Sequence, residues 1–249
     1  MIRPAPRALL RQNGLASADR RKLLRAGLSL GALTMLTGCD LSDGDAVDQA
    51  LWAMSRFNDR AQAWLFDPNR LAPTYTVADI TDPFPFNAYY VEDRLPEVDG
   101  DTWKLELSGL VQEKAPWTLA KLRTLPQESQ ITRHICIEGW SAIGQWSGVP
   151  FQTFLERVGA DTRARYVSFK CADRYYSSID MATALHPQTI LAIDFRNEPL
   201  PDKYGFPVKL RVPTKLGFKN PKQIISIAVS NDYTGGWWED QGYNWFSGS

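Results

Sequence analysis

The chain has 249 residues, enough for one domain with a sizeable core or for two small domains. Its residues are 44% hydrophobic and 22% charged, which is ordinary for a soluble globular protein, and nine tryptophans indicate aromatic-lined surfaces or pockets. Residues 1–38 carry seven of the 28 Lys/Arg and one of the 28 Asp/Glu, so the remainder has 21 basic and 27 acidic residues. This acidic balance argues against a nucleic-acid partner, which requires a basic footprint.

Residues 1–38 have the features of an export signal. Arg20 and Arg21 form a twin-arginine pattern, and the apolar run from Ala26 to Thr37 is too short to be a stable membrane span. The run ends in Leu-Thr-Gly-Cys, a lipoprotein signal-peptidase pattern that would leave Cys39 as a lipidated first residue. We therefore predict a periplasmic protein, and the pattern favours a lipid anchor on Cys39 in the inner membrane.

Two segments precede the main domain. Apolar residues at helical spacing predict an amphipathic helix over residues 45–66, which Pro68 ends. Residues 67–102 contain five prolines and predict an irregular loop, and the aromatic content of residues 84–92 argues against disorder. Long loops of this kind are usually functional. We assign residues 39–79 to an N-terminal helix and linker, and 80–249 to the main domain.

The main domain is predicted to contain more strands than helices. Strands are expected at 103–111, 131–137, 165–171, 189–195, 207–212 and 224–229, and short helical segments at 118–125, 149–158 and 178–185. The helices are short and the spacing of a regular βαβ pattern is absent. This predicts an α+β fold with a mixed β-sheet core. The aromatic tail after Tyr233 is expected to pack over that core, with a docking patch as the alternative.

Cys136 lies where the predicted strand 131–137 runs into a turn. A thiol at a strand end is a candidate ligand for a soft metal, and the neighbouring Arg133 and His134 would favour the thiolate. The ordinary alternative is an inert buried side chain. A disulfide or a thiol redox function shared with Cys171 is a further alternative, because sequence does not fix the geometry of the two thiols.

Three motifs make the sequence similar to the molybdopterin-binding domain of the sulfite oxidase family. They are Cys-Ile-Glu-Gly-Trp-Ser at 136–141, Gly-Phe-Pro-Val at 205–208 and Pro-Thr-Lys-Leu-Gly-Phe-Lys at 213–219. The likeness covers about residues 80–230 and within the family points to the branch that contains the catalytic subunit of periplasmic methionine sulfoxide reductase. It implies that family's α+β fold, a Mo-molybdopterin cofactor and oxygen-atom transfer.

The resemblance also implies a set of site residues. The Cys136 thiolate would bind molybdenum together with two dithiolene sulfurs of one molybdopterin, and sulfur donors suit a metal that cycles between Mo(VI) and Mo(IV). The implied pterin contacts are Asn87, Tyr90, Val91, Cys171, Tyr204, Lys209, Lys219, Asn220, Pro221 and Lys222. Lys215, Lys219 and Lys222 would suit a terminal phosphate, with a solvated surface as the alternative.

Three of these positions depart from the family. Cys171 stands where threonine is usual in the reductase branch, Tyr204 where asparagine or histidine is usual, and Lys209 where arginine is usual. Lysine keeps the charge of arginine but cannot form its bidentate fork. Cys136 is therefore the firmest of the implied site residues.

The residues after Cys136 bear on the substrate. Sulfite-oxidising members of the family typically continue with an asparagine-arginine run, whereas this chain has Ile-Glu-Gly-Trp and no arginine before Arg157. A glutamate and a tryptophan make a poor pocket for an anion. We therefore expect an exported, monomeric S-oxide reductase that acts on substrates such as protein-bound methionine sulfoxide, with a cytochrome b or c as electron-transfer partner. The alternatives are a sulfite dehydrogenase-like enzyme and a lipid-anchored, non-catalytic binding protein on the same fold.

Overall fold

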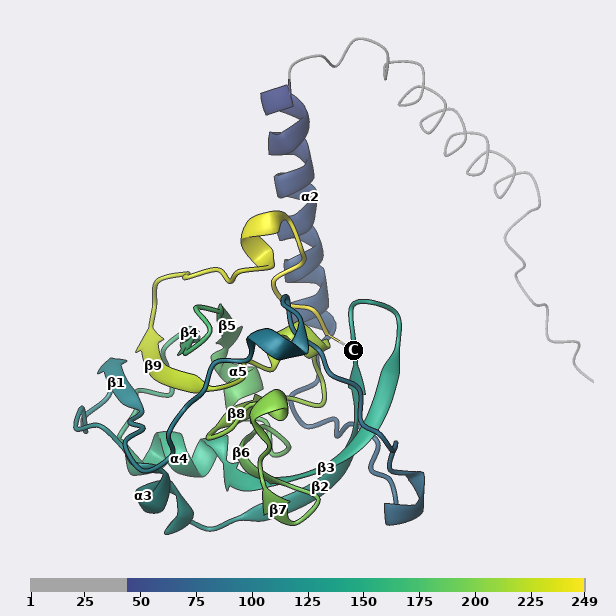
Figure 1. Cartoon of the computed structure of the whole chain (residues 1–249). Coiled ribbons are helices and arrows are strands. Elements are labelled where there is room, and N and C mark those ends of the chain that lie inside the picture. Colours follow the sequence, from purple (N-terminus) through teal and green to yellow (C-terminus); the bar gives the residue numbers. More distant parts are fainter. Residues whose placement is uncertain (1–43, 249) are drawn as a thin grey trace, which may run out of the picture. The chain divides into compact units, whose positions relative to one another are not determined.

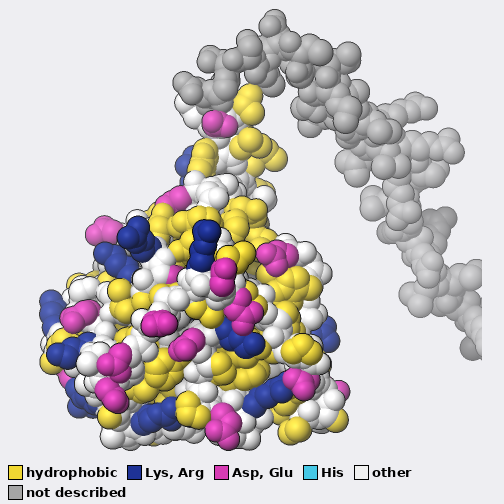
Figure 2. Space-filling model, in the orientation of Figure 1, with side chains coloured by type: hydrophobic (Ala, Val, Ile, Leu, Met, Phe, Trp, Pro, Cys, Tyr) yellow, Lys and Arg dark blue, Asp and Glu magenta, His cyan; other side chains and the backbone are white. Residues whose placement is uncertain are grey.

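The computed structural model describes residues 44–248, so the twin-arginine pattern, the apolar run and Cys39 lie outside the described residues. Helix α2 (Gly44–Leu65) confirms the helix predicted from apolar spacing. Met54, Phe57 and Trp64 expose 63%, 69% and 83% of their surface, and hydrophobic side chains are visible along α2 in Figure 2. No helix within the described residues has the length and apolarity needed to cross a membrane.

Of the described residues, 53–248 form one compact unit, which contains two β-sheets. The first sheet has the order β1 (Glu106–Gly109), β9 (Ile224–Ser230), β4 (Tyr166–Cys171) and β5 (Tyr176–Asp180) (Figure 1). β1 pairs in parallel with β9, and the other pairs are antiparallel. β1 is shorter than the predicted strand 103–111, and β5 occupies part of a segment predicted to be helical.

The second sheet is antiparallel and carries Cys136 at the end of one strand. Its strands are β2 (Glu128–Ile135), β3 (Ser141–Pro150), β6 (Ile190–Phe195), β7 (Glu198–Pro199) and β8 (Lys209–Arg211). The order is β2-β3-β6-β7, and β8 also pairs with β6. β3 was not among the predicted strands, and a register shift at Ser147/Gly148 interrupts its pairing with β6.

The helices of this unit are short. They are α3 (Leu119–Arg123), α4 (Phe151–Arg157) and α5 (Met181–Ala184), with 3₁₀ turns at Val77–Asp79, Glu92–Arg94, Asp202–Tyr204, Gly217–Lys219 and Glu239–Gln241. Thr118 caps α3 by accepting a hydrogen bond from the Lys121 amide at 3.1 Å, as the sequence predicts. Short helices packed with one mixed and one antiparallel sheet confirm the α+β fold.

Two buried clusters hold the sheets together. The larger includes Trp117, Phe151 and Phe169, all fully buried. The smaller surrounds Trp146, which meets the Phe84 ring edge-to-face with centroids 5.4 Å apart. Fully burying one such ring contributes roughly 1.5–3 kcal/mol. The smaller cluster packs beside the buried end of β2, so it gives the strand that leads to Cys136 a rigid support.

Candidate active site

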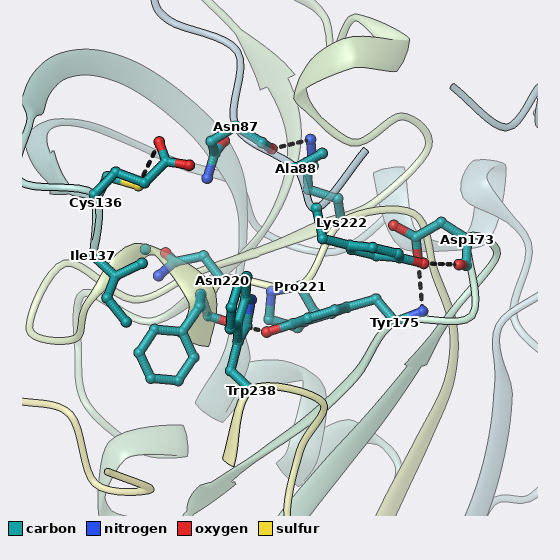
Figure 3. Close-up of a pocket in the computed structure, with 14 residues that line it drawn as sticks. Asn87, Ala88, Cys136, Ile137, Asp173, Tyr175, Asn220, Pro221, Lys222 and Trp238 are labelled. Atoms are coloured by element: carbon teal, nitrogen blue, oxygen red, sulfur yellow. Dashed lines mark hydrogen bonds between the residues drawn. The ribbon is translucent and has the colours of Figure 1, made fainter. Parts of the chain in front are cut away.

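A pocket extends from Cys136 to Asp173 and Tyr175, which stand at its two ends in Figure 3. Segments far apart in the sequence build it: the loop before the 92–94 turn, the turn after β2, the β4–β5 turn, residues 217–222 and the C-terminal tail. The lining residues are Asn87, Ala88, Tyr89, Cys136, Ile137, Glu138, Asp173, Tyr175, Gly217, Phe218, Asn220, Pro221, Lys222 and Trp238. The contribution of Trp238 confirms that the aromatic tail packs over the core.

A tight turn fixes the Cys136 thiol at the end of β2. The Cys136 amide donates to the Trp140 carbonyl at 2.9 Å, and the Gly139 amide donates to the Cys136 carbonyl at 3.2 Å. Gly139 adopts a φ of 91°, which glycine tolerates without strain. The thiol faces Glu138, with 3.7 Å between Sγ and Oε2, and the same carboxylate oxygen accepts a 2.8 Å hydrogen bond from Trp140 Nε1.

The prediction that Arg133 and His134 would favour the Cys136 thiolate is wrong. Burial, together with the nearby Glu138 carboxylate, raises the pKa of the Cys136 thiol. Burial lowers the pKa of His134 well below its usual value, so its ring is neutral near pH 7. Arg133 instead lies over the Tyr75 ring, 5.1 Å from its centroid. Residues that are neighbours in sequence therefore do not supply the positive charge of this site.

That charge comes from Lys209, Arg211 and Lys222, which expose 1%, 0% and 8% of their surface. Burial lowers the pKa of Arg211 to about 9 and that of Lys222 to about 8. Burial and then repulsion by Lys222 and Arg211 lower the pKa of Lys209. Within residues 44–248, none of the three forms an ion pair with a carboxylate. An anion bound among them would offset the cost of burying these charges.

Five of the residues implied by the resemblance converge on the pocket: Asn87, Cys136, Asn220, Pro221 and Lys222. The Lys222 ammonium donates to the carbonyl of Asn87 at 2.6 Å and to that of Lys203 at 3.1 Å, and thereby ties residues 217–222 to the aromatic loop (Figure 3). Arg211 ties the same segment to β2, because it donates to Asn220 Oδ1 at 3.0 Å and to Thr132 Oγ1 at 3.1 Å.

The other implied residues do not line the pocket. Tyr90 donates to Asp173 Oδ2 at 3.2 Å, and Val91 is 59% exposed. Cys171 is a buried free thiol, as is Cys136, so the two form no disulfide. The hydroxyl of Tyr204 donates to the Phe84 carbonyl at 2.6 Å within the smaller aromatic cluster. Lys209 lies over the Trp146 ring, 5.1 Å from its centroid, and Lys219 forms a buried ion pair with Glu239.

The three lysines that the sequence groups together have separate environments. All are buried, so the alternative of a solvated surface is wrong. Lys215 contacts the Phe66 and Phe246 rings, Lys219 donates to Glu239 and to the Ser178 carbonyl, and only Lys222 lines the pocket.

Sequence reasoning did not single out Tyr89, Asp173, Tyr175 and Trp238. The Asp173 carboxylate accepts from the Tyr90 hydroxyl and, at 2.9 Å, from the Tyr175 amide, while burial raises its pKa. A usable signal was present, because Asp173 lies two residues after the predicted strand 165–171, in a loop position where polar side chains often form sites. The tail residue Trp238 carried no comparable signal.

Gly217 permits a close approach between its segment and β2. A Cβ atom at this position would lie 2.5 Å from His134 Nε2, a distance that real side chains do not tolerate. Because residue 217 is glycine, the segment that carries Asn220 and Lys222 can pack directly against the strand that carries Cys136.

Comparison with known proteins places the chain in a family. The profile described as "Oxidoreductase molybdopterin binding domain" matches residues 92–238, more than half of the chain. The chain belongs to this family of molybdopterin-binding oxidoreductases. It is therefore a molybdenum-dependent oxidoreductase with a Mo-molybdopterin cofactor, as the sequence resemblance implied.

The relatives agree with this assignment. The chain is 62% identical over 230 residues to the "Putative protein-methionine-sulfoxide reductase subunit YedZ1" of Azospira oryzae, covering 92% of this chain and 88% of that protein. It is 30% identical over 242 residues to the protein-methionine-sulfoxide reductase catalytic subunit MsrP of Ralstonia nicotianae, covering 84% and 68% respectively. The sulfane dehydrogenase SoxCD of Paracoccus pantotrophus shares the fold, with a TM-score of 0.52 at 18% identity over 55% of this chain and 40% of that one.

The residues of the pocket fit the cofactor by their chemistry. A Mo-molybdopterin presents a soft metal and an anionic phosphate, and the pocket region offers one thiol together with unpaired buried cations. The enclosed part of the pocket holds about 70 Å³, below the roughly 300–1,000 Å³ of typical small-molecule sites. The fit therefore depends on the donor set and not on the enclosed volume.

Proposed function

We propose that this molybdopterin-binding oxidoreductase reduces S-oxides, with protein-bound methionine sulfoxide as the substrate class. The reaction breaks the S–O bond of the sulfoxide, consumes two electrons and two protons, and releases a sulfide and water. Support comes from the names of the relatives, which describe protein-methionine-sulfoxide reductases.

The observation that carries this proposal is the position of Glu138 beside Cys136. A carboxylate 3.7 Å from the thiol disfavours an anion such as sulfite, because the two charges repel each other at close range. A neutral sulfoxide experiences no such repulsion. The Tyr89 ring, stacked on Trp237 with centroids 4.7 Å apart, adds an aromatic wall of the kind that favours a methionine side chain.

Cys136 Sγ is the proposed molybdenum ligand, and Lys222 with Asn220 is proposed to hold the phosphate end. When bound, the cofactor supplies two-electron redox chemistry and oxygen-atom transfer. The chain itself holds the thiol in a tight turn, buries Cys136 and contributes the Lys222 ammonium to the lining of the pocket.

The Cys136→Ser variant tests the assignment, with Cys171→Ser as the matched control because both thiols are free and buried. We expect Cys136→Ser to lose bound molybdenum and the viologen-driven reduction of methionine sulfoxide, and Cys171→Ser to retain both. The proposal fails if the wild-type enzyme oxidises sulfite and leaves sulfoxides unchanged, or if Cys136→Ser remains fully active. Glu138→Gln should keep molybdenum and become more sensitive to inhibition by sulfite.

We further propose that the protein is exported through its twin-arginine signal, anchored at Cys39, and supplied with electrons by a cytochrome b or c. The sequence pattern at residues 20–39 supports the export and the anchor. Replacing Arg20 and Arg21 with lysine should retain the protein in the cytoplasm. Its unchanged appearance in the periplasmic fraction would contradict the export route.

A further inference from the structure

A second cavity of about 570 Å³ lies against β2, and its described lining residues include none of those that line the candidate active site. Arg133 and Ile135 of β2 line this cavity, whereas His134 between them packs toward Phe84 and Asn87. Alternate residues of a strand face opposite sides. The cavity therefore lies on the face of β2 opposite to His134, one residue away from Cys136.

The walls of this cavity are aromatic and its rim is apolar. Phe66 and Phe246 meet edge-to-face with centroids 5.4 Å apart, and the Phe246 amide donates to Asp59 Oδ1 at 2.7 Å, which fixes the wall. Leu65 and Leu71, which also line the cavity, expose 72% and 57% of their surface. Apolar side chains exposed beside a hollow of this size are typical of a ligand site.

Arg70, Arg133 and Asp67 are the charged residues that line the cavity, so its lining has a net positive charge. Arg133 is held over the Tyr75 ring, and the backbone carbonyl of Arg70 is held by His186 Nε2 at 3.1 Å. Within residues 44–248, neither guanidinium forms an ion pair or a hydrogen bond with a carboxylate. Thr214, 7% exposed, adds a buried hydroxyl that has no hydrogen-bond partner in the described structure.

We propose that this cavity binds an anionic amphiphile, a molecule with one carboxylate or phosphate head on an apolar body. The planar guanidinium of arginine matches carboxylate and phosphate oxygens and binds them through charge-assisted hydrogen bonds. The exposed leucines and the aromatic walls accommodate the apolar body. A free inorganic anion lacks the apolar body, and a neutral alcohol lacks the charge, so neither uses both the arginines and the apolar walls.

Isothermal titration calorimetry of the full-length protein tests this with four probes: octanoate, octyl phosphate, octan-1-ol and inorganic phosphate. We expect both amphiphilic anions to bind about tenfold or more tightly than the alcohol and the phosphate, because only they combine apolar burial with a charge-assisted hydrogen bond. The ratio of the dissociation constants of octanoate and octyl phosphate then shows whether the cavity prefers a carboxylate or a phosphate head group.

Arg70→Gln and Arg133→Gln should each weaken the binding of the two amphiphilic anions about tenfold, because each variant loses one charge-assisted hydrogen bond to the head group. Arg163→Gln is the matched control, because Arg163 is exposed and pairs with Asp161 away from the cavity. Unchanged unfolding midpoints would verify that the variants are folded. Equal binding of octan-1-ol, no binding of either anion, or full affinity in both arginine variants would overturn the proposal.

Discussion

The buried ion pair between Lys219 and Glu239 joins the C-terminal tail to the core, and removing one partner gives the sharpest stability prediction. The two side chains expose 1% and 2% of their surface. In Glu239→Gln the Lys219 ammonium loses its charged partner and keeps only neutral ones, such as the Ser178 carbonyl at 2.8 Å. Breaking such a pair leaves an uncompensated buried charge and costs about 3–5 kcal/mol.

For a chain of this size, about 1 kcal/mol corresponds to about 2–4 °C in Tm, so Glu239→Gln should lower Tm by about 6–20 °C. Thermal unfolding at pH 7, followed by circular dichroism, measures this loss. Burial already lowers the pKa of Lys219, and without Glu239 this pKa falls further. At higher pH the variant can relieve the cost by losing the proton, so the difference from wild type should be smaller at pH 10 than at pH 7.

Glu113→Gln is the matched control. Glu113 pairs with Lys121 and Arg157, whose side chains are 37% and 51% exposed, and such surface pairs contribute about 1 kcal/mol or less. The double replacement Lys219→Met with Glu239→Leu removes both charges and should recover most of the lost stability. A Tm loss in Glu239→Gln no larger than that in Glu113→Gln would refute this reasoning.

Three further predictions concern stability. Burial lowers the pKa of Lys215 from 10.5 to about 7, so between pH 7 and 10.5 the unfolded chain binds one more proton than the folded chain. The free energy of unfolding should therefore rise with pH across this window. Urea titrations should show a flatter rise in Lys215→Met. Arg211→Met removes the charged hydrogen bonds to Asn220 Oδ1, to Thr132 Oγ1 and to the Arg133 carbonyl, and should cost about 2–5 kcal/mol by urea midpoint. A loss below about 1 kcal/mol would contradict its bridging role. Thr118→Ala removes the cap of α3 and should cost about 1 kcal/mol, and an unchanged midpoint would contradict the cap.

Local sequence predicted the elements whose own residues specify them. The strand before Cys136 has β-branched residues, and Thr118 marks the start of α3. β3 was missed because its buried positions include Gly144 and Gly148, and glycine disfavours strands. A Cβ on Gly148 would lie 2.0 Å from the Leu191 carbonyl oxygen, so close packing against β6 requires glycine there. That requirement is invisible until the partner strand is known.

The same limit applies to the site. The motif around Cys136 and the segment 220–222 could be found because each is contiguous in sequence. The environment of Lys219 could not be predicted from the sequence, because its partner Glu239 lies 20 residues further along the chain. The buried charge around the pocket likewise depends on Arg211, whose bonds reach 78 and 79 residues back to β2. Long-range contacts decide which cations remain unpaired.

Molybdenum content is the most direct test of the central assignment, that Cys136 anchors the cofactor. It is measured by elemental analysis on protein expressed with its leader in a host competent for twin-arginine export. We expect about one molybdenum per chain in the wild type and in Cys171→Ser, and little in Cys136→Ser, because the thiolate is the protein's ligand to the metal. Full molybdenum content in a folded Cys136→Ser protein, or none in the wild type from a host that loads a control molybdoenzyme, would contradict the assignment.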